Sequence, residues 1–266
     1  MKLSLIIPTY NEKDNVSDLF LKLDKELVKH NISYEIIFVD DNSPDGTGQV
    51  LEDVRKQNEN LMIIHRNSKM GLSSAVLEGV RESNGQIICV MDADFSHPVE
   101  KIVDMYKSIL LGFDFVIGSR YTKGGSIVGW TLHRKIFSKI ATLLARPFTN
   151  VKDPMSGFFL VKREIFNIAQ IDSKGFKILL ELLVKSKSKN ILEIPITFID
   201  RQKGSSKANI SEFFLYLKNL FGYINNNNEL LKFCLVGFLG TIINILLLYL
   251  LTEKLNMFYI YSAIIA

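Results

Sequence analysis

The sequence is poor in cysteine, histidine and tryptophan, with two, four and one of these residues among 266. The two cysteines, Cys89 and Cys234, each lie inside an apolar run, so ligands for a disulfide framework or a zinc cluster are lacking. We therefore expect a reducing compartment. The first residues also lack the long apolar stretch and cleavage site of a signal peptide, so we expect the N-terminal part to stay on the cytoplasmic side.

A glycine-rich phosphate loop is also missing after the first apolar run. That run leads into Pro8-Thr9-Tyr10-Asn11-Glu12 and not into the Gly-x-Gly-x-x-Gly of dinucleotide-binding folds. The sequence therefore argues against a nicotinamide or flavin cofactor.

Charged residues are unevenly distributed, although the net charge is only +4. Residues 1–111 carry 12 basic and 18 acidic side chains, residues 112–224 carry 18 and 8, and residues 225–266 carry 2 and 2. An acidic first part is suited to holding a metal ion, whereas a basic middle part is suited to anionic substrates or an anionic membrane surface.

Short apolar runs alternate with helical patterns in the first part of the chain. The runs predict strands at 3–7, 34–39, 61–65, 86–91 and 113–117. Helical spacing predicts helices at 14–29, 47–57, 73–82 and 98–111. This order is typical of an α/β fold with a mostly parallel sheet and helices on both faces, in which ligands bind beyond the carboxyl ends of the strands.

Polar clusters follow three of these strands, at residues 8–12, 40–46 and 92–94. Each cluster alone is more often a turn or a helix cap, but three at one sheet edge indicate a site. Asp92 and Asp94 supply the hard oxygen ligands that Mg²⁺ or Mn²⁺ takes in proteins. His97 lies close by in the sequence, although a turn or cap role before Pro98 is its commoner explanation.

Two stretches of the basic part are amphipathic. Residues 130–148 and 210–224 both carry apolar side chains at helical spacing, and the first also carries five basic or histidine side chains. Each stretch fits either an ordinary helix packed on the domain or a helix lying on a membrane surface. The second precedes a long apolar run, which favours the membrane.

That apolar run, residues 233–252, contains no charged side chain. Twenty residues form a helix of roughly 30 Å, the thickness of a hydrocarbon core, so we predict a transmembrane helix in which Asn244 faces another helix. A second apolar run, 257–266, is too short to span, and we favour a fragment of a longer membrane region over an interfacial end. The expected domains are 1–209, an interfacial helix and linker at 210–228, and a membrane region at 229–266.

Seven motifs follow one another along the chain: IIPTYNE (6–12), VDDNSPDGT (39–47), GLSSA (71–75), MDAD (91–94), GSRY (118–121), DPMSGFF (153–159) and GFKILLE (175–181). Together they resemble the family 2 glycosyltransferases of GT-A (Rossmann-like) fold, and within them the polyprenyl-phosphate (dolichyl-phosphate) mannosyltransferases. The resemblance covers residues 1 to about 210 in the right order. Residues from 232 onward are similar to the start of a GtrA-like membrane domain.

The resemblance implies a nucleotide-sugar site. The residues implied to hold the base and ribose are Pro8, Tyr10, Glu12, Val39 and Asp41. Asp92, Ala93 and Asp94 would contact the sugar nucleotide, with Asp94 as the main ligand of Mg²⁺ or Mn²⁺ and Asp92 beside it. Ser96 stands where this group often has a metal-contacting Gln, so a hydroxyl or a water would fill that place. The cations implied to bind phosphate are Arg120, Arg134, Arg201 and Lys207, the last two on a closing loop.

The implied reaction moves mannose from GDP-mannose to a membrane polyprenyl (dolichyl) phosphate, for use in glycosylation. The phosphate of the lipid acceptor is already ionised at neutral pH, so its attack on the sugar needs no general base. We therefore expect a direct displacement that inverts the configuration of the sugar. The expected catalytic residues are Asp92, Asp94, Arg120 and Arg134. The first alternative is the same transfer from UDP-glucose. The second is a GtrA-like transport or scaffold protein with a nucleotide-sensing domain. We expect no nucleic-acid partner.

Overall fold

The computed structural model describes residues 1–169, 171, 177–200, 216, 220, 222 and 229–254. The described residues belong to two compact units, divided between Tyr216 and Leu217. The first unit holds all of the sheet structure described below. The predicted boundary between residues 209 and 210 lies outside the described residues.

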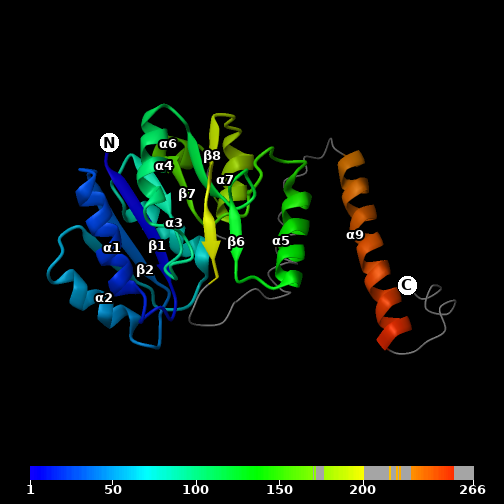
Figure 1. Ribbon diagram of the computed structural model, residues 1–266, viewed down its shortest axis with the longest axis horizontal. Coiled ribbons are helices and arrows are strands. Elements are labelled where there is room, and N and C mark those ends of the chain that lie inside the picture. The colour runs from blue at the N-terminus through cyan, green and yellow to red at the C-terminus, as the bar shows by residue number, and fades with distance from the viewer. Residues whose placement is uncertain are drawn as a thin grey trace. The chain divides into compact units, whose positions relative to one another are not determined.

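A seven-stranded sheet forms the centre of the first unit, in the order β3-β2-β1-β4-β7-β5-β8 (Figure 1). Its strands are β1 Leu3–Thr9, β2 Tyr34–Asp40, β3 Leu61–His65, β4 Ile87–Val90, β5 Phe115–Ser119, β7 Phe159–Lys162 and β8 Ile191–Pro195. Only β7 runs antiparallel to its neighbours, β4 and β5, and the remaining pairs in this sheet are parallel. A second, parallel pair joins β6 (Ser126–Val128) to β9 (Thr197–Ile199).

Helices cover both faces of the large sheet. One face carries α1 (Val16–Lys29), α2 (Thr47–Arg55) and α4 (Lys101–Leu110), and the other carries α3 (Leu72–Glu82), α6 (Arg163–Ile168) and α7 (Ile178–Ser186). Successive side chains of a strand point to opposite faces, so Leu5 and Ile7 of β1 pack in the first core and Ile6 packs in the second. The predicted α/β architecture is confirmed.

The antiparallel strand β7 was not anticipated, and it matters for the site. Because β7 runs opposite to its neighbours, its amino end lies at the same edge as their carboxyl ends. The segment that precedes β7, residues 153–158, is therefore brought to that edge. The predicted strand at 113–117 is displaced to Phe115–Ser119, since pairing with β8 continues as far as Ser119 opposite Pro195.

Beyond the large sheet, α5 (Leu132–Ala145) occupies the first amphipathic stretch. In the second unit, α9 (Glu229–Tyr249) is followed by the π-helical turn η1 (Leu250–Lys254). Within the described ranges, we find no helix with both the length and the apolar character needed to cross a membrane. The transmembrane prediction for 233–252 is not confirmed. The prediction for 257–266, and most of the one for 210–224, fall outside the described residues.

Candidate functional site

The three polar clusters meet at one edge of the sheet, as predicted. In the parallel register Thr9 lies opposite Asp40, and Ile6 lies opposite Val90, so the chain leaves β1, β2 and β4 on the same side. Hydrogen bonds join the first two clusters. The backbone N–H of Asn11 donates to Ser43 Oγ at 3.0 Å, and that of Glu12 donates to Thr47 Oγ1 at 3.0 Å.

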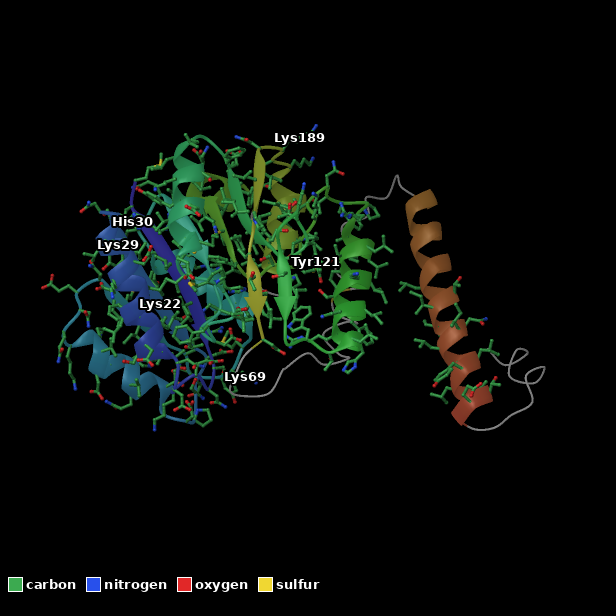
Figure 2. The ribbon with its side chains drawn as sticks, in the orientation of Figure 1. Lys22, Lys29, His30, Lys69, Tyr121 and Lys189 are labelled. Carbon is green, nitrogen blue, oxygen red and sulfur yellow. The ribbon has the colours of Figure 1, made fainter. Side chains whose placement is uncertain are left out.

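The predicted nucleotide residues take different positions at this edge. Pro8 and Glu12 are half-buried, and the carboxylate of Glu12 accepts a hydrogen bond from Asn15 at the start of α1 (2.7 Å). Tyr10 lies under the ammonium group of Lys69, which is 3.9 Å from the ring centroid; Figure 2 labels Lys69. Val39 is fully buried in the core, and its carbonyl oxygen accepts a hydrogen bond from Thr9 Oγ1, so the described structure does not expose it to a ligand.

Asp41 is buried and has an internal partner that the sequence did not reveal. Its carboxylate accepts hydrogen bonds from Arg66 Nη1 at 2.8 Å and from the backbone N–H groups of Met70 (2.9 Å) and Gly71 (2.8 Å). Arg66 is itself only 2% exposed. Asp41 and Arg66 therefore fix the loop that carries Lys69 to the end of β2.

The predicted metal ligand Asp92 follows β4 and lies against His97. The backbone N–H of Asp92 donates to His97 Nδ1 at 3.2 Å, and His97 Nε2 lies 3.9 Å from Asp92 Oδ2. Burial lowers the pKa of His97, so its imidazole is neutral at pH 7. With Nδ1 accepting, the ring proton is on Nε2, toward the carboxylate. His97 is thus part of the site and more than a turn residue.

Asp94 and Ser96 line a pocket of the same edge together with Asp200. Ser96 donates its backbone N–H to Asp94 Oδ1 at 3.1 Å. Its own Oγ is buried and has no hydrogen-bond partner in the described part of the chain. Ala93, between the two carboxylates, is buried in the core.

The donor set suits a hard divalent cation. No group of three or more His, Cys, Asp or Glu side chains among the described residues is arranged to hold a metal. Mg²⁺ and Mn²⁺ are nevertheless commonly held by one or two carboxylates, with waters and substrate phosphates completing the shell. The orphaned hydroxyl of Ser96 beside Asp94 is one further oxygen that such a shell can use. The residues present therefore fit the predicted ion.

Arg120 follows β5 and is held by a buried carboxylate from the segment before β7. Asp153, which is fully buried, accepts from Arg120 Nε at 2.8 Å, from Nη2 at 2.7 Å and from the backbone N–H at 2.9 Å. Burial opposes the charge of Arg120, but the hydrogen bonds and charge of Asp153 outweigh it and raise the pKa of Arg120. The guanidinium stays charged in an environment that is largely closed to water.

Arg134 lies on α5 and has a different partner. Its Nη1 donates to both carboxylate oxygens of Asp200, at 2.8 and 2.9 Å, and both side chains are about a quarter exposed. The sequence predicted both arginines as phosphate-binding groups but neither of their carboxylate partners. Arg201 and Lys207, the other predicted cations, lie outside the described residues.

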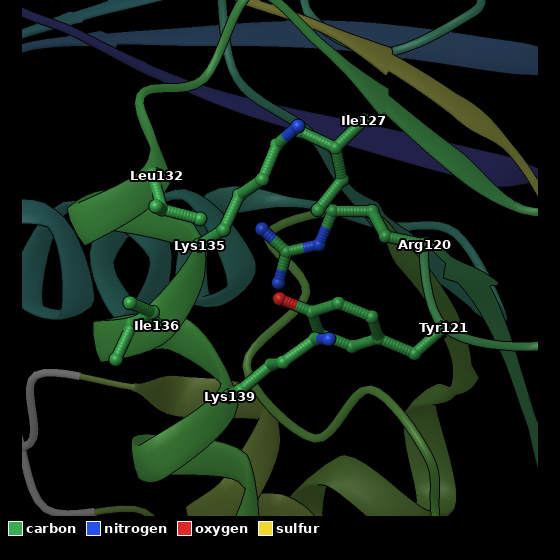
Figure 3. Close-up of a pocket in the computed structure, with 7 residues that line it drawn as sticks. All are labelled: Arg120, Tyr121, Ile127, Leu132, Lys135, Ile136 and Lys139. Atoms are coloured by element: carbon green, nitrogen blue, oxygen red, sulfur yellow. The ribbon is translucent and has the colours of Figure 1, made fainter.

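A second pocket opens between β5, β6 and α5, with a cavity of about 280 Å³ (Figure 3). Figure 3 shows the guanidinium of Arg120 and the side chains of Lys135 and Lys139 at this pocket. The residues that line the pocket are Arg120, Tyr121, Ile127, Leu132, Lys135, Ile136 and Lys139. Cationic and apolar side chains thus alternate around one opening, which is suited to a ligand that has an anionic head and an apolar body.

Carboxylates and arginines belong to one site. His97 contacts Asp92 and lies 5.5 Å from the ring of Phe198, and the guanidinium of Arg120 lies 5.6 Å from that same ring. Residues 4–168 match the Glycosyl transferase family 2 domain. The chain belongs to glycosyl transferase family 2. The predicted glycosyltransferase activity is thereby confirmed at the level of the family.

A relative supports the family assignment, and solved structures support the fold. The dolichol-phosphate mannosyltransferase of Pyrococcus furiosus is 39% identical over 251 residues, which are 92% of this chain and 70% of the relative. The mannosyl-3-phosphoglycerate synthase of Rubrobacter xylanophilus has a TM-score of 0.63 at 15% identity, over 86% of this chain and 77% of that one. The mannosyltransferase PcManGT of Pyrobaculum calidifontis, solved with GDP-Man and Mn²⁺, has a TM-score of 0.55 at 15% identity, over 76% and 57%. These structures confirm the predicted GT-A-like fold.

Proposed function

We propose that this glycosyltransferase moves mannose from GDP-mannose to a polyprenyl (dolichyl) phosphate in a membrane. The observation that carries the proposal is a chain of contacts between the carboxylates and the arginines. Asp92 contacts His97, and His97 lines one pocket with Asp94 and Asp200. Arg134 pairs with Asp200, and Arg120 lies on the same Trp130 ring as Arg134. Carboxylates for a cation and arginines for phosphates are what a transfer between two phosphorylated partners requires. The 39% identity to a dolichol-phosphate mannosyltransferase over most of the chain supports the choice of sugar and lipid.

The metal would be held by Asp94 and Asp92, with the hydroxyl of Ser96 beside them. A bound Mg²⁺ or Mn²⁺ supplies Lewis-acid neutralisation of the diphosphate that leaves the sugar. The Mn²⁺ and GDP-Man in the PcManGT structure support this requirement. His97 accepts a hydrogen bond from the backbone N–H of Asp92 and so helps to hold the chain that carries this carboxylate.

In this mechanism, an oxygen of the lipid phosphate attacks the anomeric carbon of mannose. The bond from that carbon to the nucleoside diphosphate breaks, and the configuration at the carbon inverts. A phosphate monoester is largely ionised at neutral pH, so the protein needs no general base to activate it. Arg120 and Arg134 bind and orient the phosphates, because a guanidinium contacts phosphate oxygens through two N–H groups at once.

The acceptor would enter through the pocket beside α5. Lys135 and Lys139 attract the phosphate, while Leu132 and Ile136 contact the first units of the lipid. Leu132 is 74% exposed and Phe137 is 60% exposed, so α5 presents apolar side chains next to its basic ones. This pattern is that of a helix lying on an anionic membrane surface. We place the catalytic unit on the cytoplasmic face, with the apolar segment after residue 228 as its anchor.

The test is a transfer assay with the full-length chain in membranes. Labelled GDP-mannose and labelled UDP-glucose are each offered with a short polyprenyl phosphate, with Mn²⁺, with Mg²⁺ or with EDTA. We expect labelled lipid from GDP-mannose, loss of the product in EDTA and recovery when either ion is returned. Preferential transfer from UDP-glucose would contradict the mannosyl assignment, and undiminished transfer in EDTA would contradict the metal site.

A further inference from the structure

Two guanidinium groups of the site share one aromatic ring. The Cζ atom of Arg134 lies 4.3 Å from the centroid of the Trp130 ring, and that of Arg120 lies 5.2 Å from it. Both distances are within the range of a cation–π interaction, for which tryptophan is the strongest partner. Trp130 is the only tryptophan of the sequence.

The indole is held by the small parallel sheet. Trp130 packs edge-on against Phe198 of β9, with ring centroids 5.4 Å apart, and Phe198 lies opposite Ile127 of β6. Gly129, just before Trp130, has φ +88°, and a Cβ there would lie 2.9 Å from the Cβ of Asp200. The end of β6 can approach Asp200 this closely because residue 129 is glycine. The close approach at Gly129 therefore positions both Trp130 and Asp200, the two partners of Arg134.

The same packing continues to the metal side of the site. Phe198 also meets His97, at 5.5 Å between centroids, and His97 stacks on Phe158 at 5.1 Å. His97 in turn contacts Asp92. The indole is thus connected through two aromatic contacts to the histidine that contacts Asp92.

An aromatic face has a particular advantage for holding these cations. Two like charges brought together repel, and a carboxylate that pairs with an arginine occupies N–H groups that a phosphate would use. A ring face attracts the guanidinium without taking any of its hydrogen-bond donors. It can therefore add to the hold of Asp153 and Asp200 on the two arginines without occupying any further N–H group.

We propose that Trp130 is a positioning residue of the transfer reaction, which holds Arg120 and Arg134 at a fixed separation for phosphate binding. The proposal rests on the phosphate-binding role of the two arginines given above. Trp130 is half-buried and lies between β6 and α5, outside the two cores of the large sheet, so a substitution there leaves the packing of both cores in place.

The test compares Trp130→Leu and Trp130→Phe in the full-length chain. Leucine keeps an apolar contact with Phe198 but has no ring, and phenylalanine restores a ring. We expect Trp130→Leu to lower kcat/KM by about tenfold or more, and Trp130→Phe to recover most of that loss, because ring faces carry the effect. Thermal unfolding should differ little between the two. Phe113→Leu, at a partly buried residue just before β5, is the matched control and should leave kcat/KM unchanged.

A double-mutant cycle with Arg134→Lys separates positioning from general packing. If Trp130 acts through Arg134, the lysine substitution should cost less in the Trp130→Leu background than in the natural chain. Losses that simply multiply, or a Trp130→Phe variant no better than Trp130→Leu, would overturn the proposal. If the single variants Arg134→Lys and Arg120→Lys left transfer unchanged, the phosphate-binding role of the arginines would be contradicted. That result is distinct from one that contradicts only the role of Trp130.

Discussion

The two sides of the site hold their charged groups in different ways. Asp92 and Asp94 come shortly after β4, and their partners lie within five residues: the ring of His97 for the backbone of Asp92, and the Ser96 N–H for the carboxylate of Asp94. Arg120 and Arg134 are held by the side chains of Asp153 and Asp200, which are 33 and 66 residues away in the sequence. The acidic side is therefore set by the local chain, and the basic side by long-range partners. Substitutions on the acidic side should therefore change the transfer rate directly. Substitutions on the basic side should change the position of the arginines.

The largest effect is expected on the acidic side. Asp94→Asn keeps the size of the side chain and the acceptor for the Ser96 N–H, but removes the negative charge that a cation needs. Transfer should fall by about a hundredfold or more, while thermal unfolding stays near that of the natural chain. Mannose transfer and bound Mn²⁺ are measured together. Asp104→Asn, an exposed residue paired with Lys101 on α4, is the control and should keep both.

The next largest effect is expected on stability, where the two carboxylates that hold the arginines, Asp153 and Asp200, should differ. Asp153→Asn leaves the 8%-exposed guanidinium of Arg120 without its counter-charge, which should cost about 3–5 kcal/mol of unfolding free energy. Asp200→Asn breaks a pair that water already reaches, and should cost less than about 1 kcal/mol. Denaturant unfolding of the full-length variants measures both. Equal losses of stability would show that burial does not distinguish the two arginines.

The sequence predicted the acidic side of the site better than the basic side. Periodicity located β1 to β4 and their helices, and the end of a parallel strand marks a ligand edge, so Asp92 and Asp94 could be found. The roles of Arg66, Asp153 and Asp200 could not, because each depends on a partner far away in the chain. A short antiparallel strand such as β7 leaves little periodic signal, yet it brings Asp153 to Arg120.

A smaller effect should follow from the loop that Asp41 anchors. Arg66→Lys keeps the positive charge but loses the fork that donates to Asp41 through Nη1 and to Ser74 through Nη2. The loop bearing Lys69 should then hold its position over Tyr10 less well. We expect the KM for the nucleotide sugar to rise by roughly tenfold with kcat little changed. Arg55→Lys, on the exposed side of α2, should leave the KM unchanged. A fall in kcat alone would contradict a role in donor binding.

The smallest effect is expected where the basic side meets solvent. Lys135 and Lys139 line the pocket beside α5 and attract an anion without the fixed geometry of the arginines. Replacing both by Gln should raise the KM for the lipid phosphate by about three- to tenfold at low ionic strength, and by less at high salt, since exposed charges are screened. The KM for the nucleotide sugar should stay the same. Lys56→Gln on α2, which removes an exposed charge elsewhere, is the control. An equal rise in both KM values would mean that these lysines do not distinguish acceptor from donor, and the pocket beside α5 would lose its assignment to the lipid.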